Sequence, residues 1–184
     1  MTKRAMLMAG LHLALAGAVQ AQSQQRLSIQ GSGALVFPTA EETAFKNTTR
    51  LGWEAQLRYT FSRFSLGAGY QRSTVYKVEG SDFLGAVSSL FVEPRYVVTA
   101  GSKVAVYLAG RVGMSQLVCS PAEDCAEQSW EAAYGGGAGL LYLLGSRVSL
   151  DLGSQYFATR YSTATGGTVN TGYLLARLGL SVGL

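Results

Sequence analysis

Residues 51–61 read LGWEAQLRYTF, and apolar and polar side chains alternate along the whole stretch. Successive side chains of a β-strand point to opposite faces, so this alternation predicts one strand with an apolar and a polar face. A helix would distribute both sets around its circumference, and a helix is therefore excluded here. One face holds Leu51, Trp53, Ala55, Leu57, Tyr59 and Phe61, and the other holds Gly52, Glu54, Gln56, Arg58 and Thr60.

The same two-residue period recurs along the chain and predicts seven further strands. They span 26–37, 64–76, 90–98, 104–114, 132–144, 148–156 and 172–184, although Leu141 and Leu143 blur the alternation of the glycine-rich sixth stretch. The 184 residues include 23 glycines and only 14% charged residues, which argues against a helical bundle and against disorder. The expected fold class is all-β, an eight-stranded antiparallel up-and-down transmembrane β-barrel.

The connections between the expected strands alternate in length. Long connections cover 38–50, 77–87, 115–131 and 161–171, and short ones cover 62–63, 99–103 and 145–147. Long outer loops alternating with tight inner turns are typical of barrels in the bacterial outer membrane. Because the first connection is long, we expect the four long loops to face outside and both mature termini to lie in the periplasm.

The distribution of side-chain size indicates which face points into the barrel. The apolar face carries bulky residues such as Trp53, Tyr70 and Leu108, whereas the other face carries mainly Gly, Ser and Ala with a few charges. Small residues inside and large ones outside favour a barrel in lipid, and the aromatic residues near strand ends fit two interfacial girdles. The alternative is a soluble eight-stranded barrel, such as a lipocalin, whose aromatic residues are ordinary core.

The N-terminus has the pattern of a cleaved secretory signal. Lys3 and Arg4 precede an apolar run over 5–18, and 19–21 supplies small residues for cleavage. We therefore expect a signal peptide over 1–21 and a barrel domain over 22–184; an uncleaved membrane anchor fits less well because the apolar run is short. Cleavage removes two of the 15 basic residues and leaves 13 against 11 acidic ones, so the formal net charge falls from +4 to +2. Nucleic-acid binding gains no support from this charge.

Export places Cys119 and Cys125 in an oxidising compartment, where a disulfide within the third long loop is expected. The alternative, a metal or redox pair, lacks further ligands and the C-x-x-C spacing.

Three stretches carry a resemblance to a known family: FVEPRY at 91–96, AYGGGAGLLY at 133–142 and the closing strand 173–184. With this pattern the chain resembles the small eight-stranded outer-membrane barrels of the OmpA/OmpX type. The resemblance implies insertion by the barrel assembly machinery. Such proteins usually end in Phe or Trp, whereas this chain ends in Leu184, so its insertion signal is weaker than usual.

The polar face of the expected strands carries seven charged side chains: Glu54, Arg58, Glu93, Arg95, Arg111, Asp151 and Arg177. Glu54 and Arg58 lie about 13 Å apart on one strand, at ~3.3 Å per residue, and cannot bond to each other. Each is expected to pair with a residue of a neighbouring strand, Glu54 with Arg95 or Arg111, and Arg58 with Glu93 or Asp151. Side chains can fill an eight-stranded interior, so we expect a charge network in a plugged lumen.

Three further cations, Arg72, Lys77 and Arg160, lie near the expected outer rim, where they can meet the phosphates of lipopolysaccharide. The alternative is simple snorkelling of long cations to the membrane interface.

Histidine chemistry is absent from the mature chain, because the single histidine, His12, lies in the expected signal peptide. This excludes Ser-His-acid triads, Cys-His dyads and histidine-ligated zinc. We expect no catalytic residue, no metal and no cofactor, although an enzyme built on Glu54, Glu93 and Asp151 alone stays open as a third reading.

The expected function is that of a monomeric outer-membrane barrel with a structural or surface-interaction role. Its expected partners are membrane lipid, lipopolysaccharide and, during insertion, the assembly machinery, and no nucleic acid. The alternative is a small narrow-pore channel or transporter-like barrel.

Overall fold

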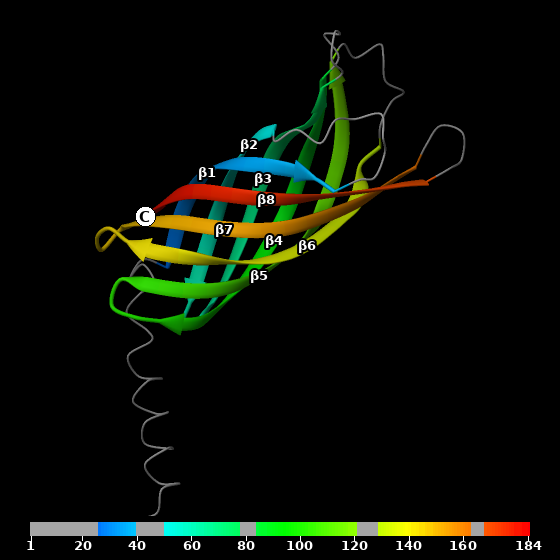
Figure 1. The fold of residues 1–184 in the computed structure, drawn as a ribbon. Coiled ribbons are helices and arrows are strands. Elements are labelled where there is room, and N and C mark those ends of the chain that lie inside the picture. The colour runs from blue at the N-terminus through cyan, green and yellow to red at the C-terminus, as the bar shows by residue number, and fades with distance from the viewer. Residues whose placement is uncertain (1–25, 40–49, 78–83, 121–128, 163–167) are drawn as a thin grey trace, which may run out of the picture.

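Eight strands form a closed antiparallel barrel in which each strand pairs with its neighbours in sequence and β8 pairs with β1 (Figure 1). The structure is a computed structural model that describes residues 26–39, 50–77, 84–120, 129–162 and 168–184. It confirms the fold class expected from the alternation. The strands are β1 (Leu27–Pro38), β2 (Arg50–Phe61), β3 (Phe64–Lys77), β4 (Leu84–Ala100), β5 (Val104–Ser120), β6 (Glu131–Leu143), β7 (Val148–Ser162) and β8 (Thr168–Gly183).

No helix in the described part of the chain is long and apolar enough to span a membrane. The expected signal peptide, 1–21, lies outside the described residues, so its cleavage stays a prediction.

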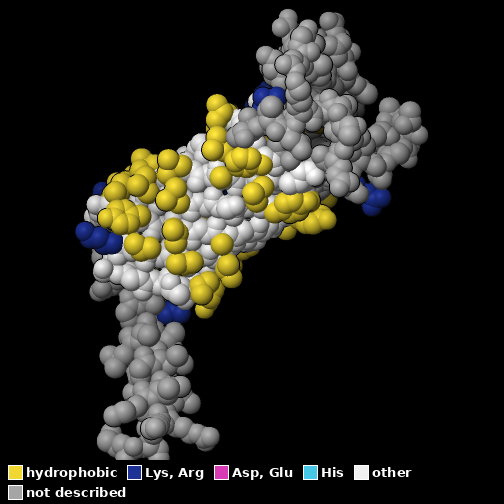
Figure 2. Space-filling view, in the orientation of Figure 1, with side chains coloured by type: hydrophobic (Ala, Val, Ile, Leu, Met, Phe, Trp, Pro, Cys, Tyr) yellow, Lys and Arg dark blue, Asp and Glu magenta, His cyan; other side chains and the backbone are white. Residues whose placement is uncertain are grey.

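The two-residue period separates the barrel wall from its lumen. On β2, Trp53 and Leu57 are about half exposed, whereas Glu54 and Arg58 are buried. Every strand contributes a bulky apolar side chain that is 43% to 56% exposed: Ile29, Leu57, Leu66, Leu90, Leu108, Leu140, Leu152 and Leu178. Figure 2 shows apolar side chains spread over this wall, with Lys and Arg side chains near its two ends.

The barrel has two distinct ends. The turn end carries the connections 62–63, 101–103 and 144–147, and it also holds Arg26 and Leu184, where the described chain begins and ends. The backbone N–H of Leu184 donates to the carbonyl of Leu27 (2.9 Å), which joins the two chain ends there. The opposite end, here called the loop end, carries the longer connections.

The strands reach further toward the loop end than the alternation predicted. β4 begins at Leu84 and β5 ends at Ser120, where strands over 90–98 and 104–114 were expected. The connections before β4 and after β5 are therefore shorter than predicted. The paired polar residues Ser88 and Gln116 interrupt the apolar face there, but the backbone pairing continues. On the lumen face the hydroxyls of Ser89 and Ser115 lie 2.9 Å apart. The predicted connections 77–87, 115–131 and 161–171 are accordingly too long, since the strands leave 78–83, 121–130 and 163–167.

The lumen is bulkier than the prediction of small interior residues allowed. One apolar cluster fills its loop-end half and includes Phe157, Tyr173 and Leu175, and a second surrounds Tyr107 near the turn end. Glycine makes the room: a Cβ on Gly139 of β6 would overlap the Tyr107 hydroxyl. The glycines of β6 therefore accommodate large side chains of neighbouring strands inside a narrow barrel.

Candidate functional site: a charge cluster in the lumen

Seven ionised side chains from β2, β4, β5, β7 and β8 meet inside the barrel, all at most 5% exposed. Their inward direction follows from the same parity that puts the bulky apolar residues outside. We call this set the lumen cluster; its members are Glu54, Arg58, Glu93, Arg95, Arg111, Asp151 and Arg177. The structure thus brings together the seven residues that the sequence placed on the polar face.

Glu93 is the centre of the lumen cluster. Its carboxylate accepts hydrogen bonds from Arg58 Nη2 (2.8 Å), Arg95 Nε (2.6 Å) and Arg111 Nη2 (2.5 Å). Arg177 donates to it as well, from Nη1 at 3.1 Å and from Nη2 at 3.2 Å. Four guanidinium groups therefore share one fully buried carboxylate as a counter-ion.

The other two carboxylates extend the lumen cluster toward both ends. Glu54 accepts from Arg111 Nη2 and from Arg177 Nη1, both at 2.9 Å. Asp151 accepts from Arg95 Nη1 and from the Tyr107 hydroxyl, both at 2.6 Å. Charge-assisted hydrogen bonds of this kind are about twice as strong as neutral ones.

The partners come from farther around the barrel than the expectation of neighbouring strands allowed. Glu54 on β2 pairs with Arg111 on β5 and Arg177 on β8, and Glu93 on β4 pairs with Arg177 on the opposite strand β8. Arginine side chains are long enough to reach the axis of a narrow barrel, so they bond across it. The Arg177–Glu93 pair therefore crosses the full width of the lumen.

Four glutamines that were not among the expected site residues complete the cluster. Gln56 bonds both Arg58 (2.6 Å) and Glu54 (3.3 Å) from its place between them. Gln71 accepts from Arg111 (2.6 Å), Gln155 donates to Glu93 (2.8 Å), and Gln30 donates to Asp151 (2.9 Å). All four occupy lumen-facing positions of the same two-residue alternation as the charged residues, and that alternation was sufficient to identify them.

Two arginines also stack on aromatic rings that the lumen encloses. The guanidinium of Arg111 lies 3.7 Å from the ring centre of Phe91, and that of Arg95 lies 4.4 Å from the ring centre of Tyr107. Cation–π contacts are strengthened by removal from water, so these rings hold the arginines in place.

The two rim cations whose side chains the structure describes lie on separate strands. Arg72 lies on β3 and Arg160 on β7, both exposed on the outer side of the wall near the loop end. Lys77 ends β3, and its side chain lies outside the described part of the structure. Contact of these residues with lipopolysaccharide stays a prediction.

The cysteine pair stays a prediction too, because Cys125 and the side chain of Cys119 lie outside the described residues.

No group of three or more His, Cys, Asp or Glu side chains that could hold a metal occurs among the described residues. Each carboxylate of the lumen cluster accepts hydrogen bonds from arginine, and these bonds link different strands of the wall. That the chain is not an enzyme and uses no cofactor stays a prediction.

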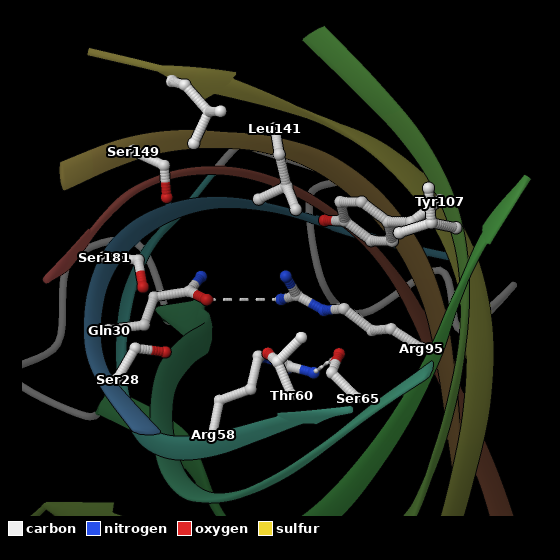
Figure 3. A pocket seen from close by; sticks show the side chains of 12 residues that line it. Ser28, Gln30, Arg58, Thr60, Ser65, Arg95, Tyr107, Leu141, Ser149 and Ser181 are labelled. Carbon is white, nitrogen blue, oxygen red and sulfur yellow. Dashed lines mark hydrogen bonds between the residues drawn. The ribbon is translucent and has the colours of Figure 1, made fainter. Parts of the chain in front are cut away.

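A small cavity of about 30 Å³ adjoins the lumen cluster at the turn end. All eight strands contribute to its lining, from Ser28 on β1 to Ser181 on β8 (Figure 3). Arg58 and Arg95 of the lumen cluster face it, and Arg95 Nη2 donates to Gln30 Oε1 across it at 3.4 Å.

A closed eight-stranded barrel with an apolar wall and a charged lumen is the fold of the small outer-membrane β-barrel proteins. Neisserial surface protein A superimposes with a TM-score of 0.71 at 15% identity, covering 86% of this chain and 97% of that one. Outer membrane protein H of P. aeruginosa gives 0.53 at 15% identity, covering 84% of this chain and 99% of that one. The attachment invasion locus protein of Yersinia pestis gives 0.51 at 15% identity, covering 85% and 98% respectively.

At these identities the likeness establishes the fold alone. No protein-family model matches the sequence, and no curated protein matches it significantly.

Proposed function

We propose that this chain is an integral protein of the bacterial outer membrane with a structural or surface-interaction role and a lumen that does not conduct. The observation that carries the proposal is the lumen cluster, whose buried ion pairs reach from β4 to the opposite strand β8. A barrel bonded through its own centre serves as a scaffold for its loops rather than as a pore.

The apolar outer face of the barrel wall supports insertion of the protein in a lipid bilayer. Bulky apolar side chains are exposed on all eight strands, whereas soluble monomers rarely expose large contiguous apolar patches. A soluble barrel of the lipocalin type has its apolar face inside, whereas here seven charges occupy the lumen.

Exposed aromatic residues near both ends fit the two interfaces of a bilayer. Those near the turn end are Tyr59, Phe61 and Tyr142, and those toward the loop end are Phe37, Trp53, Tyr134 and Tyr156.

The proposal includes an orientation with the loop end outside and both mature termini in the periplasm. Two exposed positions test it: Thr39, directly after β1 at the loop end, and Ser146, in the turn between β6 and β7. On intact cells, Thr39→Cys is expected to react with a membrane-impermeant thiol reagent and Ser146→Cys is not. The parent chain supplies the background from its own cysteines, and lysed cells show that both positions can react. Labelling of Ser146→Cys alone would reverse the orientation.

Conductance separates the scaffold from the narrow-channel alternative. Single-channel recordings of the refolded chain in planar bilayers are expected to show no steady conductance, because ion pairs fill the lumen at the level of Glu93. Steady channel openings that are absent when the protein is omitted would favour the narrow-channel function over the non-conducting scaffold.

The proposed partners are outer-membrane lipid, lipopolysaccharide at the loop end and the barrel assembly machinery during insertion, with the protein as a monomer. The outward Arg72 and Arg160 support the contact with lipopolysaccharide, because guanidinium groups bind phosphate well.

A further inference from the structure

The lumen cluster does not balance its own charge. Among the described residues, the buried ionised side chains are four arginines and three carboxylates, so four minus three leaves one positive charge. A buried charge that lacks a counter-ion is costly in free energy. The excess therefore calls for an additional negative group or for close contact with solvent.

The excess is located at Arg58. Arg95 and Arg111 each form ion pairs with two carboxylates, and Arg177 contacts three. Arg58 pairs with Glu93 alone, through the oxygen Oε1 that Arg95 Nε also uses. It is thus the least compensated cation among the described members of the cluster.

Arg58 also has a free donor. Its Nε is buried, and no hydrogen-bond acceptor for it occurs among the described residues. The Nε atoms of Arg50 and Arg177 are in the same state, but neither residue lines the turn-end cavity, whereas Arg58 does.

The chemistry of the turn-end cavity suits an anion. Besides Arg58 and Arg95 its lining includes the hydroxyls of Ser28, Thr60, Ser65, Ser149 and Ser181, and none of the described lining residues is acidic (Figure 3). Its volume of about 30 Å³ exceeds the ~10–15 Å³ that one water needs, so it has room for one small ion. Thr60, Leu141 and Leu143 at its edge are partly exposed, so small ions reach it from the turn end.

We propose that this cavity binds one small monovalent anion, of which chloride is the commonest, as the missing counter-ion of the lumen cluster. Arg58 supplies the charge and the free Nε–H donor, and the surrounding serine and threonine hydroxyls donate the remaining hydrogen bonds. With the anion bound, four positive charges face four negative ones.

Anion-dependent stability tests the proposal. The full-length chain, refolded in detergent micelles, is unfolded with urea in sodium chloride or in sodium gluconate of equal ionic strength, since gluconate is too large for the cavity. Chloride at a hundred times its dissociation constant is expected to raise the ratio of folded to unfolded protein about a hundredfold, and gluconate to leave it unchanged. Equal stabilisation by both salts would overturn the proposal.

A matched pair of variants assigns the effect to Arg58. Arg58→Gln makes the lumen cluster neutral, so the difference between chloride and gluconate is expected to disappear. Arg147→Gln removes the same charge from an exposed turn at the same end and is expected to keep the difference. Retention of the chloride effect in Arg58→Gln would contradict the site.

Diffraction supplies a second readout that needs no variant. Crystals of the unmutated protein grown in sodium bromide are expected to give an anomalous peak between Arg58 and the cavity hydroxyls. A cavity without bromide in such crystals would refute the proposal even if Arg58→Gln failed to fold.

Discussion

Replacing Glu93 with glutamine is expected to lower the free energy of unfolding by about 3–5 kcal/mol, the loss typical of breaking a buried charge network from one side. Four guanidinium groups share this carboxylate as a counter-ion, and it is fully buried. Its neutralisation raises the positive excess of the lumen cluster from one charge to two. Urea unfolding of the refolded barrel in lipid vesicles measures the effect.

Two further variants show whether the loss comes from charge. Glu131→Gln makes the same chemical change at the loop end of β6, where the carboxylate bonds the exposed Ser129, and is expected to cost less than ~0.5 kcal/mol. Adding Arg58→Gln to Glu93→Gln restores the original charge excess and is expected to recover part of the stability. If Glu93→Gln were as mild as Glu131→Gln, solvent would be screening the lumen and the network would not be a structural centre.

Replacing Leu108 with arginine is expected to cost about 2–4 kcal/mol, the penalty for a cation at the mid-plane of a barrel's lipid face. Leu108 lies on β5, is 55% exposed and points out of the wall between Tyr96 of β4 and Ala138 of β6. In lipid its arginine side chain would have to leave the hydrocarbon region or remain there unpaired. Unfolding in vesicles, and the fraction that inserts during refolding, measure the effect.

Ser146→Arg is the control, because it places the same side chain in an exposed turn, where the expected change is less than ~0.5 kcal/mol. If Leu108→Arg were harmless and Leu108→Ala were damaging, the outer face would be a protein core and a soluble assembly would replace the membrane barrel.

Alternation along the chain predicted the strands because the outer face of the barrel wall is apolar and the inner face is mostly polar. It failed at the loop end of β4 and β5, where Ser88 and Gln116 interrupt the apolar face while backbone pairing continues. Hydrogen bonds between strands depend on register and not on side-chain polarity, so a polar residue does not end a strand.

The members of the lumen cluster were predictable, and so were the pairs Glu54–Arg111 and Arg58–Glu93, but the pairs that Arg177 forms with Glu54 and Glu93 were not. Parity decides which face a side chain takes, and it placed Glu54 and Arg177 inside. Which strands face each other depends on closure of the barrel, a property of the whole sheet that no local pattern contains. The size of the interior residues was misjudged for a related reason, since Tyr107 fits only because β6 presents Gly139 opposite it.

The span of the cluster's ion pairs along the chain has a consequence for folding kinetics. Arg177 lies 123 residues from Glu54 and 84 from Glu93, so these bonds form only after the last strand has closed against the first. Interactions that are absent from the folding transition state slow unfolding and leave the folding rate almost unchanged. The bonds of Arg177 are therefore expected to slow unfolding of the closed barrel and to leave its folding rate almost unchanged.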